Sequence, residues 1–456
     1  MAVERVSKED FIMIQAGFAR VDVTPPLGTF VAGYFEARFA EGILDPIQLN
    51  AIAMGEGEDR VLIITSDFLG IRENYATPIR EKIAARTGIA ADHIMVTALH
   101  QHTSICLRGG PDNNVIEDYD YMQMLYRKFC DVAQMAIADM SDATMSYAEQ
   151  MCEKELSFVR RYLLKDGRVK TNPGADKYVG QIVGSTEQSD NTVRLVKFVR
   201  EGKKTIALVN FSTHPDVIGG KKYSADWPGF VRRFVEAEHE GVDCLLLNGC
   251  QGDTNHINFM LPTAEERFPK GKGYPHAEYM GRHIANTVNA LWDKTAEMKD
   301  QTVGGGVTTV YNRTRTDKEE FFEECWEVYE ARALNHDYTV SKSKSGIEMA
   351  EAYRVVKIRT EAPMYQKIPV TALRVGEIGF VGFGGEPFTH YATAVRENFP
   401  GKTVIAACCA NGYQGYLPTA KAFEQGGYEA ISSPFSPNLE SDCVAAATDL
   451  LKGMAF

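Results

Sequence analysis

The sequence has no pair of cysteines at the spacing of a metal site or a disulfide framework. Its nine cysteines include the adjacent pair Cys408-Cys409 but no Cys-x-x-Cys. Neither a disulfide-stapled fold nor a cysteine-type zinc site is therefore indicated. Cys250, in the polar loop 248–258, is the one thiol that we keep as a candidate functional group.

The sequence also lacks a long apolar run and an excess of positive charge. No run approaches the ~20 apolar residues that span a bilayer, and the charged N-terminal stretch MAVERVSKEDFIMIQAG has no apolar core of a secretory signal. Forty-nine Lys and Arg against 61 Asp and Glu give a formal charge of −12. That balance argues against nucleic acid or an anionic membrane as a partner. We expect a cytoplasmic protein with a small-molecule substrate, and a homo-oligomer is compatible with the sequence.

Short apolar runs alternate with amphipathic segments through most of the chain. The runs are rich in Val, Ile and Leu, as buried strands are, and they cover 60–71, 94–100, 205–214, 243–250, 378–385 and 403–409. Apolar residues recur at the three- and four-residue spacing of amphipathic helices over 120–140, 228–241, 277–294 and 318–335. The segment 177–211 has a hairpin pattern. The sequence therefore predicts an α/β fold with mixed β-sheets and flanking helices.

No internal repeat or low-complexity segment divides the chain. The one linker-like stretch, 335–353, is polar and rich in Ser and Lys, and it could separate a main body from a C-terminal third. The segment 370–388, however, has the pattern of further core strands. A single composite domain over 1–456 is therefore the preferred interpretation.

Histidines occur where two of the predicted strands end. His100 and His102 lie two positions apart on a segment that we expect to be extended, which would turn both rings to one face. His214 ends another run, and Pro215 forces the chain out of the strand there. Taken alone, each histidine is better explained by a structural role than by a ligand role. Together they favour a metal, because zinc is commonly held by histidines and a carboxylate with one position open for water.

Glu386 is the candidate carboxylate. Glycines at 382, 384 and 385 allow close packing of the backbone before it, and Pro387 is expected to open the following helix at its first turn. The alternative is that Glu386 only caps that helix, where its charge would be favourable.

Two further strand ends are rich in polar residues. The loop 248–258 holds Asp, Asn and His, which also build ordinary turns, and the stretch 411–416 is followed by a later tyrosine. The candidate side chains are Asp253, Asn255, His256, Tyr413, Tyr416 and Tyr428. Because a buried tyrosine is often only a core residue with its hydroxyl bonded, spacing does not distinguish among the three tyrosines.

Taken in order, these stretches resemble the neutral/alkaline ceramidase family, the non-lysosomal zinc amidases. The resemblance begins at 16–34, AGFARVDVTPPLGTFVAGY, which is similar to the family's opening G-x-D-x-T-P-P-x-G, and it runs to YEAISS at 428–433. It implies a fold like the N-terminal catalytic domain of the ceramidases.

The resemblance also implies a zinc site. The family's T-H-T-H-S-G-P strand is similar to LHQHTS, its second histidine stands at a strand end like that of STHPD, and its Pro-Gly-Glu segment is similar to GGEPF. Its N-x-Y-x-x-Y motif is similar to NGYQGY. The implied ligands are His100, His214, Glu386 and Tyr416, and His102 becomes a neighbour that contacts substrate.

Two further residues of the implied site act on the substrate carbonyl. A tyrosine twelve residues after the last ligand, before Glu-Ala, corresponds to Tyr428 and would polarise the carbonyl. The family's active-site arginine follows an asparagine and corresponds to Arg160, although Val159 replaces the asparagine and Arg161 competes for the assignment.

The sequence departs from the family at two points. In the ceramidases the loop reads G-D-V-S-P-N, and its serine is regarded as the nucleophile or its equivalent; here the loop is GDTNHIN, with Asn255 at the aligned position. Secreted ceramidases also carry a signal sequence and a C-terminal sandwich domain, and we expect neither in a chain that ends at Phe456. Both departures lead away from a ceramide substrate.

Without the serine, the attacking group most simply becomes a zinc-bound water. Tyr428 and Arg160 would hold the developing oxyanion, and His102 would transfer the proton. We also expect Asp226 or Asp253 to orient a ligand histidine. The substrate-binding residues would be Asp253, Asn255 and His256.

These features favour a small, soluble substrate with a carbonyl group. We expect a zinc-dependent hydrolase that opens a cyclic 1,3-diketone by C–C hydrolysis, as in cyclohydrolases of the dihydrophloroglucinol type. Hydrolysis of an amide or a lactone is the alternative. A non-catalytic metal-binding relative is a further alternative, but such a protein has no reason to keep the whole ligand set.

Overall fold

The structure is a computed structural model of the chain. It describes residues 13–34, 37–57, 59–108, 119–174, 178, 180–315, 322–335, 337 and 349–456. The linker-like stretch 335–353 lies largely outside the described residues, so the subdivision suggested there stays a prediction.

The larger of two main sheets runs through the middle of the molecule and has nine strands among the described residues. Its strands are β1 (Ile14–Asp22), β3 (Gln48–Glu56), β4 (Asp59–Ser66), β6 (Ile94–Ala98), β8 (Ser141–Met151), β13 (Thr192–Arg200), β14 (Thr205–Phe211), β16 (Val242–Asn248) and β18 (Ala296–Glu297). Their order is β16-β14-β13-β8-β1-β3-β4-β6, with β18 paired to β8. The outer pairs β14–β16 and β4–β6 are parallel and the pairs between them antiparallel, so the sheet is mixed.

A second, four-stranded sheet packs against the first. Its strands, in sheet order, are β19 (Val303–Arg313), β20 (Tyr365–Val375), β21 (Ile378–Phe383) and β23 (Thr403–Ala407). One apolar cluster joins the two sheets: Ile63 and Phe198 of the larger sheet are buried with Leu373 and Phe380 of the smaller one. Such a dry layer between two sheets is the main driving force for this arrangement.

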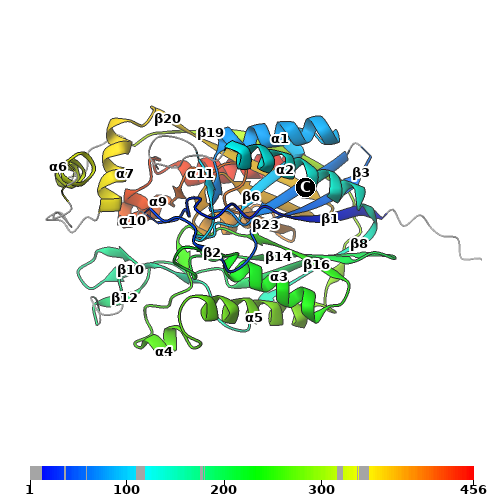
Figure 1. The fold of residues 1–456 in the computed structure, drawn as a ribbon, viewed down its shortest axis with the longest axis horizontal. Coiled ribbons are helices and arrows are strands. Elements are labelled where there is room, and N and C mark those ends of the chain that lie inside the picture. Colours follow the sequence, from blue (N-terminus) through cyan, green and yellow to red (C-terminus); the bar gives the residue numbers. More distant parts are fainter. Residues whose placement is uncertain are drawn as a thin grey trace, which may run out of the picture.

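Helices cover the outer faces of both sheets (Figure 1). The larger sheet is covered by α1 (Glu73–Thr87) with α2 (Tyr119–Ala138), and by α3 (Asp226–Glu238) with α5 (Tyr274–Leu291). The smaller sheet is covered by α8 (Thr389–Glu397) and α11 (Leu439–Gly453). The result is a four-layer α/β/β/α architecture, which confirms the predicted fold class.

Shorter elements surround the polar ends of the strands. They are β2 (Gly42–Ile43), β5 (Gly70–Ile71), β7 (Cys106–Leu107), β9 (Phe158–Val159), β10 (Arg161–Leu164), β11 (Val169–Thr171), β12 (Ile182–Ser185), β15 (Lys222–Tyr223), β17 (Thr254–Asn255), β22 (Glu386–Pro387), β24 (Tyr416–Leu417), α4 (Ala264–Arg267), α6 (Phe322–Tyr329), α7 (Met349–Thr360), α9 (Ala420–Gln425) and α10 (Tyr428–Ile431). A three-residue 3-10 turn, Ala91–His93, precedes β6, and a π-helical turn, Glu330–Leu334, follows α6.

Two local predictions about Glu386 and its neighbours need correction. Pro387 does not open the next helix, because it pairs with Leu417 in the short parallel bridge β22–β24 and α8 begins at Thr389. Glu386 belongs to the same bridge, and the N-cap of α8 is Phe388. The alternative that Glu386 only caps this helix is therefore wrong.

All nine cysteines are free, as their spacing in the sequence predicted. Cys250 is buried in the core of the smaller sheet, where burial raises the pKa of its thiol. Cys250 is therefore not a reactive group.

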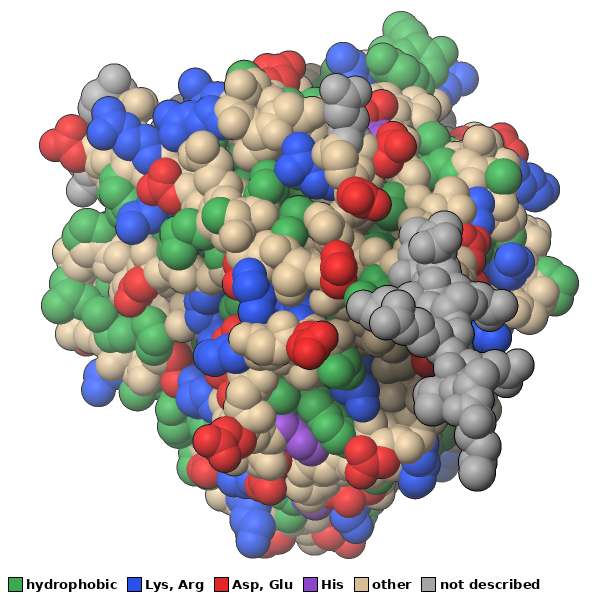
Figure 2. Space-filling model, turned by 90° about the vertical axis from the view of Figure 1, so that its right-hand side faces the viewer, with side chains coloured by type: hydrophobic (Ala, Val, Ile, Leu, Met, Phe, Trp, Pro, Cys, Tyr) green, Lys and Arg blue, Asp and Glu red, His purple; other side chains and the backbone are tan. Residues whose placement is uncertain are grey.

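Figure 2 shows Lys and Arg interspersed with Asp and Glu on one face of the molecule. Among the described residues, no helix is both long enough and apolar enough to cross a bilayer.

A buried ion pair fixes the segment that follows β4. The guanidinium of Arg232 on α3 donates two bonds of 2.8 Å to the carboxylate of Asp67, and both residues are nearly inaccessible to solvent. Asp67 also accepts bonds from the Gln48 N–H and from the side-chain amide of Gln101. Because Gln101 stands between His100 and His102, the ion pair anchors the histidine segment to α3.

We expect Arg232→Met to lower the free energy of unfolding by about 3–5 kcal/mol, because it leaves the Asp67 carboxylate buried without its counter-charge. Urea denaturation measures the loss. The double variant Arg232→Met/Asp67→Asn should recover part of it, since no buried charge is left unpaired. Lys221→Met, which removes an exposed ion pair with Glu41, is the control and should cost less than ~1 kcal/mol. Equal losses in the two single variants would contradict the role of the buried pair.

Candidate metal centre and its cavity

The two neighbouring histidines come together through a turn and not through an extended strand. Strand β6 ends at Ala98, and His100 has a left-handed backbone conformation with φ of 77°. The prediction that His100 and His102 lie on an extended strand, with both rings on one face, is therefore wrong. The rings nevertheless meet, with 3.3 Å between their Nε2 atoms, because the backbone reverses at His100 and brings His102 back towards it.

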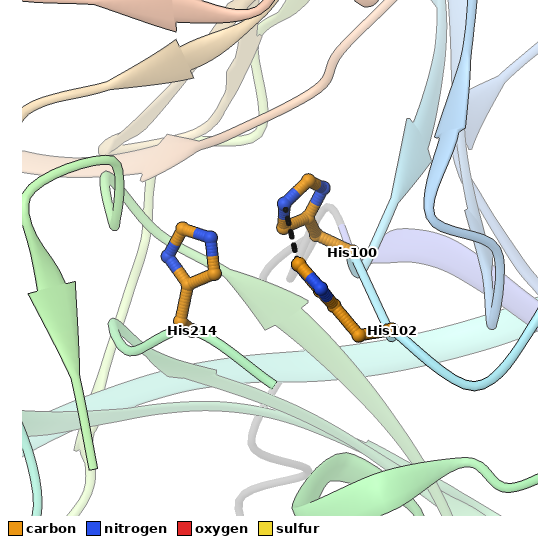
Figure 3. A group of neighbouring side chains, drawn as sticks. All are labelled: His100, His102 and His214. Carbon is orange, nitrogen blue, oxygen red and sulfur yellow. Dashed lines mark hydrogen bonds between the residues drawn. The ribbon is translucent and has the colours of Figure 1, made fainter. Parts of the chain in front are cut away.

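Three histidine side chains and one carboxylate converge at this turn. His100, His102 and His214 form a cluster whose candidate ligand atoms all lie within 4.8 Å of one another (Figure 3). Glu386 completes it, because its Oε2 atom lies 3.3 Å from His100 Nε2 and 3.4 Å from His214 Nε2. The cluster can hold a metal ion.

Two of the histidines are held in the orientation of metal ligands. The Nδ1 atom of His100 lies 2.7 Å from the Leu69 carbonyl oxygen, and Nδ1 of His214 lies 3.0 Å from that of Gln251. Each Nδ1 therefore donates its proton to a backbone carbonyl, which directs Nε2 towards the cluster. The expectation that Asp226 or Asp253 orients a ligand histidine is thus wrong, because backbone carbonyls do so.

Orphaned buried atoms support the metal assignment. Nε2 of His214 and Oε2 of Glu386 are buried and have no hydrogen-bond partner among the described residues. Burial, followed by the charge of Arg160, lowers the pKa of His214 to about 3, so its ring is neutral at pH 7. Although burial opposes it, the neighbouring His100 holds the pKa of Glu386 well below its ordinary value. A neutral imidazole and an ionised carboxylate are the ligand forms that a divalent cation requires.

Glu386 is held by the chain on its other side. Its Oε1 atom accepts a bond of 3.1 Å from the hydroxyl of Tyr413. The backbone of Gly252 passes so close that a Cβ there would lie 2.2 Å from the Glu386 carbonyl oxygen. The loop 248–258 can therefore pack against the carboxylate segment only with glycine at this position.

His102 differs from the other two histidines. Its Nδ1 atom has no hydrogen-bond partner among the described residues, and the nearest carboxylate oxygen, Asp216 Oδ1, is 3.6 Å away. Burial and then His100 lower the pKa of His102 well below its ordinary value, so its ring is neutral. Because it lacks the carbonyl anchor of a ligand histidine, His102 is suited to proton transfer or to contact with a substrate.

The structure distinguishes between the two adjacent arginines. Arg160 lies against the site: its guanidinium carbon is 5.3 Å from the centre of the Tyr416 ring, and it donates to the carboxylate of Glu429 and the carbonyl of Gly252. Arg161 shares Glu429 but turns away to the carbonyl of Gly426. The structure therefore places Arg160 at the site.

Two tyrosines stand next to Arg160. Tyr416 is the register partner of Glu386 in the β22–β24 bridge, and its ring centre is 5.6 Å from that of Tyr428. Burial raises the pKa of both phenols, so both hydroxyls carry their proton at neutral pH. A second guanidinium, that of Arg354 on α7, lies 5.3 Å from the Tyr428 ring centre. Tyr428 can therefore act as a hydrogen-bond donor beside two cations.

A cavity of about 260 Å³ reaches the metal cluster at His214. His214 and Arg160 are buried lining residues, and Asp216 lines the cavity as well. The remaining lining residues are Asn172, Val217, Asn255, His256, Ile257, Phe268, Lys272 and Gly273. Two of the three predicted substrate-binding residues thus line the cavity.

The third, Asp253, is not among the lining residues, because its carboxylate accepts bonds from the backbone and hydroxyl of Thr389. Asp226 likewise accepts bonds from the backbone N–H groups of Val217, Ile218 and Trp227. Both acids are structural.

Sequence reasoning missed Asp216, Arg354 and the particular role of Tyr413. Asp216 follows His214 by two positions, and that proximity was the available signal. Tyr413 was one of three tyrosines with no signal to distinguish it. Arg354 lies on a helix between β19 and β20, far along the chain from the other site residues, and carried no signal at all.

The fold and the histidine cluster define a mixed α/β protein with a candidate metal site at its strand ends. Its fold is that of neutral ceramidase. The neutral ceramidase of Pseudomonas aeruginosa superposes with a TM-score of 0.68 at 13% identity, over 96% of this chain and 74% of that one. A ceramidase complexed with C2 gives a TM-score of 0.70 at 14% identity, over 97% of this chain and 75% of that one. No family model and no curated protein sequence matches the chain.

Loss of His100 and loss of His102 should have different effects on the metal. We expect purified wild type to bind about one divalent metal ion per chain, and His100→Ala to lose it, because a ligand is removed. His102→Ala should keep the metal. Elemental analysis by mass spectrometry measures both. Metal loss in His102→Ala equal to that in His100→Ala would show that His102 is a ligand.

Tyr413→Phe should weaken metal binding about 10- to 100-fold, because Glu386 loses the partner that orients its carboxylate. Competition with a chromogenic chelator measures the affinity. Tyr311→Phe, at an exposed position on β19, is the matched control and should leave it unchanged. An unchanged affinity in Tyr413→Phe would mean that the Tyr413 bond does not orient the ligand.

Proposed function

We propose that the protein is a zinc-dependent hydrolase that attacks a carbonyl group of a small substrate with an activated water. The observation that carries the proposal is the convergence of His100 Nε2, His214 Nε2 and Glu386 Oε2. One of the three residues, His214, also lines a cavity. The fold shared with neutral ceramidases supports a hydrolase.

The donor set fits zinc. Two imidazole nitrogens and a carboxylate oxygen are common zinc ligands, and we propose Tyr416 as the fourth. The separations of 3.3 and 3.4 Å between Glu386 Oε2 and the two Nε2 atoms would let these three atoms bind one zinc ion. A zinc ion bound at this position would polarise the carbonyl and make a nucleophile available at neutral pH.

The chain's own groups would complete the reaction. His102, a neutral imidazole beside the ligands, would accept the proton of the attacking water and return it to the leaving group. The hydroxyl of Tyr428 and the guanidinium of Arg160 would stabilise the negative charge that develops on the carbonyl oxygen. One such positioned donor typically lowers the barrier by about 3–4 kcal/mol.

The attacking group would be water because Asn255, which corresponds to the serine of the ceramidases, has an amide side chain. Asn255 donates from its amide to Asn172 Oδ1 and accepts from the Ile257 N–H. An amide held in this way is no nucleophile. It instead presents a fixed polar group to the cavity.

The cavity favours a small, polar substrate. Its volume of about 260 Å³ corresponds to roughly nine groups of the size of a water molecule. We therefore favour the ring-opening hydrolysis of a cyclic 1,3-diketone, as in a cyclohydrolase of the dihydrophloroglucinol type. Water adds to one carbonyl, the adjacent C–C bond breaks, the carbon takes up a proton, and a carboxylate forms. We also propose that the reaction takes place in the cytoplasm, as part of catabolism.

Hydrolysis of an amide or a lactone is the second candidate, because the same groups would stabilise the same kind of oxyanion. The likeness of the fold to that of ceramidases favours the amide. A long-chain lipid amide is disfavoured by the cavity's volume and by its polar lining of Arg160, Asn172, Asn255, His256 and Lys272.

Tyr428→Phe should lower kcat about 10²- to 10³-fold on the best substrate, because the oxyanion loses a donor, and should leave the metal content unchanged. A panel of soluble amides, lactones and cyclic 1,3-diketones, together with ceramide, identifies that substrate. Tyr365→Phe, an exposed tyrosine of β20, is the control and should keep full activity. Ceramide as the best substrate would overturn the proposed substrate class, and full activity in Tyr428→Phe would overturn its role.

A further inference from the structure

The outer end of the cavity has its own cationic group. Lys272 lines the cavity and is exposed to solvent, whereas His214 and Arg160 are buried. The cavity therefore runs from His214 of the metal cluster to an exposed lysine at its rim.

The fold holds Lys272 at the rim. It stands in the connection between α4 and α5, flanked by Gly271 and Gly273, whose φ values of 91° and 72° form a tight turn. Its ammonium lies 5.2 Å from the centre of the Phe268 ring, a cation–π contact with another lining residue. This contact places the ammonium of the exposed lysine beside a residue of the cavity wall.

The lining offers more positive charge and hydrogen-bond donors than acceptors. Arg160 and Lys272 contribute two cations in a chain whose formal charge is −12. Among the described residues, the one acidic lining residue is Asp216, which already accepts a bond from the Tyr34 hydroxyl. The Nδ1 atom of His256 is buried and has no hydrogen-bond partner among the described residues. A ligand with oxygen acceptors suits the two cations of this lining.

We propose that Lys272 is a specificity-determining residue that binds a negatively charged oxygen of the substrate, at the end remote from the reacting carbonyl. This inference rests on the proposed function and names its substrate class: a small anion, with an enolate or carboxylate oxygen near Lys272 and a carbonyl near His214 and Arg160. An enolised cyclic 1,3-diketone belongs to this class, and so does a carboxylate-bearing amide.

Kinetics on the zinc-loaded enzyme test the inference. Lys272→Gln should raise KM for an anionic substrate about fivefold to tenfold and leave kcat unchanged, since a charge-assisted contact far from the reacting bond is lost. Lys272→Arg should retain most of the affinity. The matched control is Lys270→Gln, another exposed lysine two positions away that does not line the cavity. Equal KM changes in the Lys272 and Lys270 variants, or on neutral and anionic substrates, would overturn the proposal.

A binding measurement separates this inference from the proposed function. Calorimetry with glutarate and its neutral diamide should show at least fivefold tighter binding of glutarate to wild type and to Lys270→Gln, a preference that disappears in Lys272→Gln. High salt should weaken the preference. If the preference is present but no compound is hydrolysed, only the proposed function fails. If wild type binds both probes equally, the inference fails even where hydrolysis is observed.

Discussion

The metal cluster depends on how tightly His100 is fixed. Its backbone N–H donates to the Phe68 carbonyl oxygen at 2.9 Å, its ring Nδ1 donates to that of Leu69 at 2.7 Å, and its backbone is left-handed. These constraints together leave the ring one orientation, with Nε2 towards Glu386 and His214. Because the segment after β4 provides both carbonyls, the buried Asp67–Arg232 pair that holds this segment also holds the ligand. The strained φ of His100 is tolerated because several hydrogen bonds to the surrounding structure fix this backbone conformation.

The charged groups around the cluster are arranged by a second buried anchor. Glu429 is inaccessible to solvent and accepts bonds from Arg160, Arg161 and the hydroxyl of Thr171. One carboxylate thus holds two guanidiniums, which avoids the cost of an unpaired buried charge. The guanidinium of Arg161 bonds only to groups of this framework among the described residues. Arg160 is positioned by the same carboxylate and also lines the cavity. This is why two adjacent arginines with the same chemistry have different roles.

The layers of the fold could be predicted from the sequence, but much of the site's geometry could not. Buried strands such as β4 and β16 are continuous apolar runs, and this signal is local. The reversal at His100 has no local signal, because it depends on carbonyls about thirty positions earlier in the chain. The groups that orient the candidate ligand histidines also had no local signal. Asp226 and Asp253 were suitable by residue type, but backbone carbonyls accept the bonds from the two Nδ1 atoms. Tyr413 could be separated from Tyr416 only once the structure had brought it to Glu386.

The site combines residues near the ends of strands with residues on connections and helices. The candidate ligands stand at or just after strand ends, whereas Lys272 stands on the connection between α4 and α5 and Arg354 on α7. In such folds a rigid scaffold usually positions the reactive groups, and its loops determine which substrate is bound. At 13–14% identity, the likeness to the ceramidases shows the fold alone. The proposed hydrolysis needs no nucleophilic side chain, and an amide bonded on both sides, that of Asn255, is compatible with attack by water. On the proposal made for Lys272, this lysine would determine which carbonyl compound is bound, and not how it is attacked.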